Sequence, residues 1–120
     1  MSIFKDQEVF MTACGQTVGQ FNVDQFNLYL SLLSEECKEL GEALAKQDRV
    51  ETLDALLDVI VTAVGAIHSM GARGEQAWSA VVASNMAKID PDTGKVKTRE
   101  DGKIMKPEGW QPPNLSDFIE

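Results

Sequence analysis

The chain is poor in the residues that build soft-metal sites and disulfide frameworks. It has a single histidine, His68, and two cysteines, Cys14 and Cys37, among 120 residues. One histidine does not suit a zinc site, and it cannot supply the two Glu-x-x-His pairs of a di-iron helical protein. We expect His68 to be a packing or capping residue. Both cysteines fall within helix-like periodicity and nothing indicates an oxidising compartment, so we expect reduced core thiols in a cytoplasmic protein.

Long apolar runs and positive charge are also scarce. The longest apolar run, Ala55–Ile67, contains Asp58 and is far shorter than the roughly 20 residues of a membrane-spanning helix. We therefore expect no membrane partner, and the first residues do not predict a signal peptide. Eleven Lys and Arg against 19 Asp and Glu leave a formal net charge of −8. This charge argues against nucleic acid as a partner, because binding a polyanion needs a basic footprint.

Apolar periodicity predicts a single all-α domain spanning residues 1–120, with a helical core at about 3–89. Ser2 and Asp24 are candidate N-caps, Gly71 is a candidate C-cap, and Pro91 stops the last helix. The expected helices are about 3–18, 24–47, 50–70 and 75–89. The expected core stripe of the second helix is Phe26, Leu30, Leu33, Cys37, Leu40 and Leu44.

The chain changes character after residue 90. Residues 95–106 alternate polar and apolar about an Asp-Gly pair, which predicts a small basic hairpin. A proline-containing extended tail follows at residues 107–120 and carries Trp110. Trp110 is positioned either to stack on a base or to pin the tail to the helices, and pinning is the preferred interpretation.

Two helical segments carry carboxylates at helical spacing. Like charges held close together raise one another's pKa unless a cation lies between them. Two such ridges facing each other therefore predict a divalent-metal site, whereas a solvated acidic face is the alternative. The third helix is apolar nearly all round, which indicates burial and favours the metal. Hard oxygen ligands suit Mg²⁺, with Mn²⁺ possible. The acids are Glu35, Glu39 and Glu42 with Glu36 on their flank, and Asp54 with Asp58 one turn later.

The acids also resemble a family signature. Residues 35–39, Glu-Glu-Cys-Lys-Glu, match the Glu-Glu-x-x-Glu motif of the all-α nucleoside triphosphate pyrophosphohydrolases. That MazG-like superfamily includes the phosphoribosyl-ATP pyrophosphohydrolases, and the sequence looks similar to its small stand-alone or phage-type branch. Glu51 and Asp54 satisfy the second motif, Glu-x-x-Asp, literally. The apolar run that follows Asp58 looks more like the family's Asp-leading segment.

The resemblance implies a four-helix MazG-like bundle and a Mg²⁺-dependent enzyme that converts a nucleoside triphosphate to the monophosphate and pyrophosphate. Phosphoribosyl-ATP pyrophosphohydrolase and a non-catalytic acidic interaction module are the alternatives. Apolar surface exceeds what one short chain covers, so a homodimer or homotetramer is expected. The candidate residues are Glu35 for catalysis, Glu36, Glu39, Asp54 and Asp58 for the metal, and Asn85, Lys88, Arg99, Lys103 and Trp110 for the substrate.

Overall fold

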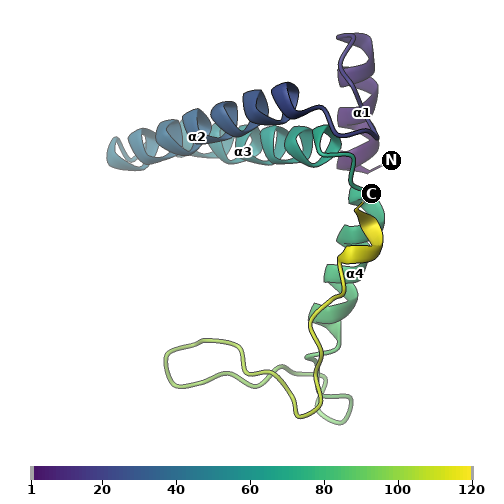
Figure 1. The fold of residues 1–120 in the computed structure, drawn as a ribbon. Coiled ribbons are helices and arrows are strands. Elements are labelled where there is room, and N and C mark those ends of the chain that lie inside the picture. Colours follow the sequence, from purple (N-terminus) through teal and green to yellow (C-terminus); the bar gives the residue numbers. More distant parts are fainter. Residues whose placement is uncertain (1, 120) are drawn as a thin grey trace. The chain divides into compact units, whose positions relative to one another are not determined.

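The computed structural model describes residues 2–119 and is all-helical, which confirms the predicted class. Its helices are α1 (Ile3–Ala13), α2 (Val23–Ala45), α3 (Arg49–Ser69), α4 (Gly74–Met86) and a short 3-10 helix, η1 (Ser116–Phe118). Within residues 2–119 no strand forms (Figure 1). The chain divides into two compact units. The first contains the residues up to Gly74 with Ile119, and the second is Glu75–Phe118.

Helix α1 begins as predicted and ends earlier than predicted. The Ser2 hydroxyl accepts a hydrogen bond from the Lys5 amide at 3.1 Å, so Ser2 is the N-cap. The helix ends at Ala13 rather than near Val18. Gly15 has φ of +76°, a conformation that glycine adopts readily and that cannot continue a right-handed helix.

Helix α2 begins one residue before the predicted cap. Asn22, not Asp24, is the N-cap, and its side chain accepts the Gln25 amide at 3.1 Å. Asp24 lies in the first turn, where a negative charge interacts favourably with the helix dipole. Both residues are good caps by type, and the extended backbone of Asn22 (φ −114°) makes it the capping position.

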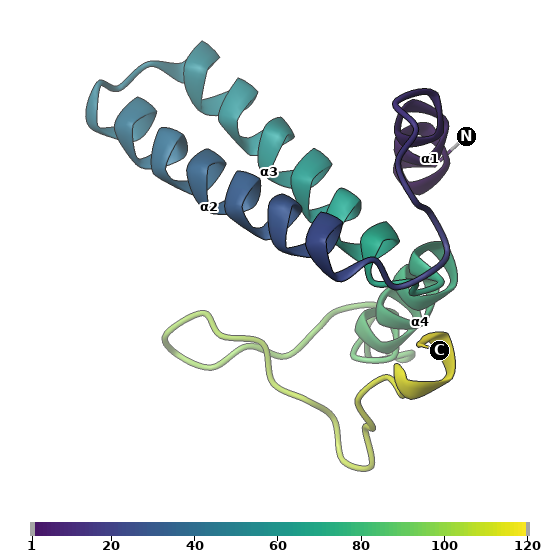
Figure 2. The same cartoon turned by 45° about the horizontal axis from the view of Figure 1, so that its top comes forward.

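Helices α2 and α3 lie side by side as an antiparallel pair (Figures 1 and 2). At one end a short loop joins them. Asp48 in this loop caps α3, because its side chain accepts hydrogen bonds from the amides of Val50 and Glu51. At the other end the Gln25 side chain donates to the Ser69 hydroxyl at 2.8 Å, and the Asn22 amide donates to the Ser69 carbonyl at 2.9 Å. The helix pair is therefore fastened at both ends.

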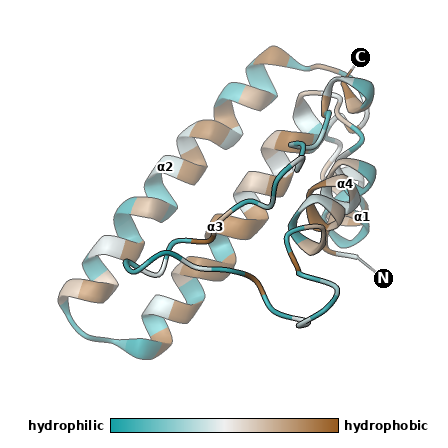
Figure 3. Ribbon diagram, turned by 90° about the horizontal axis from the view of Figure 1, so that it is seen from below, coloured by the Kyte–Doolittle hydropathy of each residue, from teal (hydrophilic) through white to brown (hydrophobic). Residues whose placement is uncertain are grey.

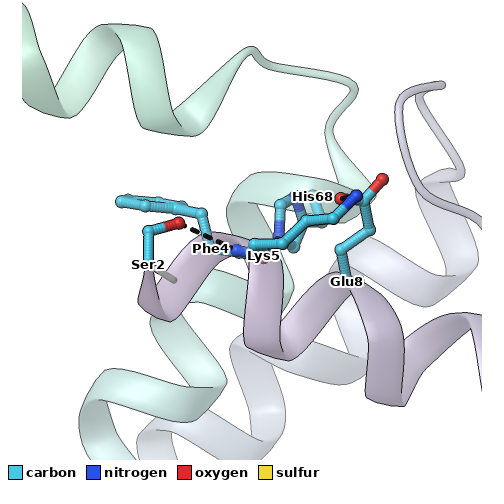
Figure 4. A network of polar contacts seen from close by, with 5 residues as sticks. All are labelled: Ser2, Phe4, Lys5, Glu8 and His68. Carbon is cyan, nitrogen blue, oxygen red and sulfur yellow. Dashed lines mark hydrogen bonds and ion pairs between the residues drawn. The ribbon is translucent and has the colours of Figure 1, made fainter.

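Helix α3 ends where the sequence predicts and then meets α1. Met70 is the C-cap, and Gly71 follows with φ of +81°. Near this end, His68 Nε2 lies 2.8 Å from the Phe4 carbonyl oxygen, and the two rings meet edge to face (Figure 4). His68 is thus a buried packing residue, as expected.

The core of the α2–α3 pair overlaps the predicted stripe of α2 only in part, through the half-buried Phe26, Leu33 and Leu40. Tyr29 and Ala43 are the buried residues of α2, whereas Leu30, Cys37 and Leu44 are exposed. Helix α2 has apolar side chains on opposite sides, and periodicity alone does not say which side meets α3. Cys14 is also exposed, so both cysteines are unpaired but neither is a core thiol.

Helix α3 is not buried all round within the single chain. Its buried residues, apart from Ala55, lie in the second half, from Thr62 onward. Leu53, Leu57 and Ile60 remain 59%, 52% and 44% exposed. Hydrophobic colouring continues along much of the pair (Figure 3). An apolar face of α3 is therefore uncovered in one chain. None of the described helices is long and apolar enough to cross a membrane.

The second unit consists of α4, a long loop and the tail. Residues 95–106 form no strands; one antiparallel bridge joins Thr98 and Ile104, and the Arg99 amide donates to the Lys103 carbonyl at 2.8 Å. The Trp110 indole Nε1–H donates to the Ser84 carbonyl at 2.8 Å. Trp110 therefore pins the tail to α4, which confirms the preferred interpretation.

Candidate active site

Glu36 is the central carboxylate of the first unit. It lies seven residues after Tyr29 and seven before Ala43, which are both buried on the face of α2 toward α3. Seven residues are about two helical turns, so the three side chains share one face. Glu36 is half-buried, and its Oε2 is shielded from solvent with no hydrogen-bond partner among the described residues. The sequence placed Glu36 on the flank of the acids, and in the structure it is the acid whose pKa is raised by burial and by Glu39, Asp58 and Asp54.

The other predicted metal ligands, Glu39, Asp54 and Asp58, all affect the pKa of Glu36. Burial raises the pKa of Glu36 to about 7 from an ordinary value of 4.5, and contact with the Glu39 side chain raises it in the same direction. The negative charges of Asp58 and Asp54 add smaller effects of the same sign. One further acid of α2 and two acids of α3 therefore act on Glu36.

The three acids of α3 that the sequence left open as ligands differ in their effect on Glu36. Asp54 and Asp58 both raise the pKa of Glu36, and Glu51 is not among the groups that do so. Glu51 lies in the first turn of α3, where its amide is bonded by the capping Asp48. Of these three acids, Asp54 and Asp58 are therefore the ones whose charges act on Glu36. Glu35 lies beside Glu36 on α2 and is exposed.

The four acids fit a divalent cation by their chemistry. An orphaned, shielded carboxylate oxygen is costly unless a cation or proton satisfies it. In the part of the chain that the structure describes, no lysine or arginine forms an ion pair with Glu36. As they stand, no three His, Cys, Asp or Glu side chains of residues 2–119 converge closely enough to hold a metal ion. All the available donors are hard oxygens, which suit Mg²⁺ or Mn²⁺.

The predicted substrate-binding residues lie in the second unit. Lys88 Nζ donates to the Asn85 side-chain oxygen at 3.0 Å and lies 4.9 Å from the centroid of the Trp110 ring. Arg99 pairs with Asp101 at 3.1 Å. These residues belong to the second unit and the acids belong to the first. Their meeting in one site stays a prediction.

A second lysine of this unit also lies near the Trp110 ring. Lys106 Nζ also lies 4.9 Å from the centroid of the Trp110 ring. The spacing of Lys106 and Trp110 carries no such signal by itself, because the contact depends on the backbone turn in which the Trp110 amide bonds the Pro107 carbonyl. Lys103, which the sequence favoured, is exposed.

Comparison with known families places this all-α chain among the pyrophosphohydrolases, enzymes that hydrolyse phosphorus-containing anhydrides. The model of the phosphoribosyl-ATP pyrophosphohydrolase family matches residues 12–85, which is more than half of the chain. The chain belongs to this family, within the MazG-like all-α superfamily. Enzymes of the family generally use divalent metal ions. No curated protein matches the chain.

The family model matches most of the first unit and only the α4 part of the second. It includes all of α2 and α3, with Glu36 and its neighbouring acids, and extends to Asn85 in α4. Lys88, Arg99, Lys103 and Trp110 lie beyond it. The family match therefore covers the acids, and the basic loop lies outside it.

Proposed function

We propose that the protein is a Mg²⁺-dependent nucleoside triphosphate pyrophosphohydrolase, with Mn²⁺ as a possible substitute. It would cleave a canonical or non-canonical ribo- or deoxyribonucleoside triphosphate to the monophosphate and pyrophosphate. The observation that supports the proposal most strongly is the orphaned Oε2 of Glu36, shielded between two helices and surrounded by acids. It occurs in a chain whose family hydrolyses phosphoanhydrides.

The reaction assigns a role to each group of acids. Glu36, Glu39, Asp54 and Asp58 would hold the cation, which supplies positive charge beside the phosphate oxygens. Glu35 is exposed next to them and would orient the attacking water and accept its proton. The water oxygen bonds to the α-phosphorus, and the bond from that phosphorus to the bridging oxygen breaks. Pyrophosphate then leaves.

The family match also favours a second candidate, phosphoribosyl-ATP pyrophosphohydrolase. This reaction breaks the same kind of anhydride, so the same acids serve both. A panel of canonical triphosphates, damaged triphosphates and phosphoribosyl-ATP separates the two. We expect pyrophosphate release that requires Mg²⁺ or Mn²⁺ and stops with a chelator. If no member of the panel releases pyrophosphate with either metal, the acids belong to an interaction module and the enzymatic proposal is wrong.

The uncovered apolar surface supports a homodimer or homotetramer. A groove of about 540 Å³ near the α2–α3 loop is lined by Leu44, Leu53 and Leu56, which are 57%, 59% and 44% exposed. A second groove, of about 280 Å³, lies between α1 and α3 and is lined in part by Leu57 and Ile60. Exposed apolar surface on this scale marks an interaction site. A second copy of the chain would cover it.

We expect Leu53→Asp to convert the oligomer to a monomer, because a buried unpaired charge opposes association. Light scattering at micromolar concentration measures the mass of each variant. The control is Leu115→Asp, which introduces the same charge at an exposed leucine of the second unit and should leave the oligomer intact. A wild-type protein that is monomeric at this concentration would contradict the prediction.

A further inference from the structure

The second unit contains a cavity of its own. It measures about 420 Å³ and is formed by the residues that follow α4 and by the far part of the basic loop. This volume lies in the range of small-ligand sites, about 300–1,000 Å³. Three lysines line it: Lys88, Lys97 and Lys106. In a chain of net charge −8, a cavity lined by three lysines is a marked concentration of positive charge.

The residues that line the cavity carry a net positive charge, which attracts anions. Asp90 and Glu108 also line the cavity, so two carboxylates oppose three ammonium groups. The Oδ1 of Asp90 accepts the Asp92 amide at 2.8 Å, which commits that oxygen to its own turn. The balance remains positive by one charge. A multiply charged anion is the ligand that fits it.

Two of the three lysines, Lys88 and Lys106, lie against the ring of Trp110. The ammonium groups of Lys88 and Lys106 each lie 4.9 Å from the centroid of its ring. The indole Nε1–H is fixed to the Ser84 carbonyl, so the ring cannot turn freely. Two like charges are therefore held near one ring, and an anion that contacts both would be stabilised by both. With ammonium groups over it, the ring is not free to stack on a base.

We propose that this cavity binds the phosphoanhydride group of a nucleotide or of pyrophosphate, with Lys88, Lys97 and Lys106 contacting the phosphate oxygens and Trp110 positioning two of them. The proposal rests on the proposed function only for the choice of a phosphoanhydride among anions. It leaves out Arg99 and Lys103, two of the substrate contacts expected from the sequence. Arg99 pairs with Asp101, and neither Arg99 nor Lys103 lines the cavity.

Calorimetry with the full chain, in a chelator and at fixed salt, tests the cavity without the metal. The probe is inorganic pyrophosphate, followed by a nucleoside triphosphate analogue with a non-hydrolysable α,β linkage. Lys97→Ala and Lys106→Ala should each weaken pyrophosphate binding about tenfold, because each removes a charge-assisted hydrogen bond. Binding of both probes identifies the substrate's phosphate tail as the ligand, and binding of pyrophosphate alone identifies the product.

Lys95→Ala is the matched control. Lys95 belongs to the same loop, is exposed and does not line the cavity. Its hydrogen bonds to Thr93 and Asp90 use backbone atoms, which alanine retains. We expect unchanged affinity. Absence of pyrophosphate binding, or an equal loss in Lys95→Ala and Lys97→Ala, overturns the proposal, because the second result means diffuse attraction by the loop.

Two further variants test the role of Trp110 and separate this proposal from the enzymatic one. Trp110→Leu should weaken pyrophosphate binding, and Trp110→Phe, which keeps an aromatic face, should restore most of it. Equal losses in both variants would overturn the positioning role. Glu36→Gln should bind pyrophosphate in the chelator as the wild type does. Pyrophosphate binding without any hydrolysis would refute the proposed function alone, and hydrolysis without binding at the cavity would refute this proposal alone.

Discussion

Glu36→Gln is expected to abolish pyrophosphate release and, at the same time, to raise the melting temperature of the metal-free protein at pH 8. Loss of a central metal ligand should reduce activity by at least about 100-fold, the upper end of what loss of a supporting partner costs. The stabilisation arises because glutamine removes a negative charge that burial and the neighbouring acids disfavour. An activity loss with a gain in stability distinguishes a functional carboxylate from a structural one.

The pH dependence of this gain follows from the direction of the pKa shift. The pKa of Glu36 is about 7 in the folded protein and 4.5 ordinarily, so the folded state binds the proton more tightly. The stability of the wild type therefore falls as pH rises through the interval between these values. The difference in melting temperature between Glu36→Gln and the wild type should grow across that interval and then become constant. Thermal denaturation in a chelator at a series of pH values measures it.

Addition of Mg²⁺ completes the test. A cation that binds only the folded wild type raises its melting temperature by mass action, and this gain should vanish in Glu36→Gln. Glu42→Gln is the control, because Glu42 is an exposed acid of the same helix and is not among the groups that raise the pKa of Glu36. It should behave as the wild type does. If Glu36→Gln keeps both its activity and its response to Mg²⁺, the metal assignment is wrong.

Gly65→Ala is expected to lower the melting temperature by about 10 °C. A Cβ at Gly65 would lie 2.2 Å from Cε1 of Tyr29. The Tyr29 ring is 5% exposed, and its hydroxyl donates to the Gln16 side-chain oxygen at 2.6 Å, so the ring has little room to move. Overpacking of this kind costs up to about 3 kcal/mol or somewhat more. That cost exceeds the roughly 1 kcal/mol or less that alanine gains over glycine inside a helix.

Two further variants test whether the loss of stability in Gly65→Ala comes from a clash with the Tyr29 ring. Gly41→Ala is the control, because Gly41 is also inside a helix and a Cβ there would meet nothing within 4 Å. It should be neutral or slightly stabilising. Tyr29→Leu combined with Gly65→Ala should cost less than the sum of the two single changes, since the clash requires both groups. Additive losses would mean that Gly65 does not serve to admit the Tyr29 ring.

The sequence predicts the acids of the site better than it predicts their geometry. Spacing selects Glu36, Glu39, Asp54 and Asp58 as candidates, because carboxylates at helical intervals on neighbouring helices can face one another when those helices pack. It does not identify Glu36 as the central one. A helical wheel gives angles within one helix, and the direction toward α3 is set by Tyr29 and Ala43, which the apolar stripe did not emphasise.

At the helix ends and in the basic loop, the sequence again predicts the residue types involved better than the backbone geometry that places them. Ser2 is predicted correctly and Gly71 lies one residue beyond the C-cap with a positive φ, because a cap or a positive φ is a local property of one residue type. The choice between Asn22 and Asp24 depends on backbone conformation, which both types allow. In the loop, the alternation of lysines predicts a basic segment. Which lysines face the cavity depends on the turn that carries Trp110.

The fastening of α2 and α3 at both ends has a consequence for ion uptake. The loop at Asp48 joins one end, and the bonds from Gln25 and Asn22 to Ser69 join the other. Repulsion among the acids between these ends cannot be relieved by separating the helices. The pair must instead exchange ions, taking up a proton in acid and giving it up when a cation enters. Cation affinity should therefore rise with pH up to the pKa of Glu36, and below that pKa cation binding should acidify an unbuffered solution.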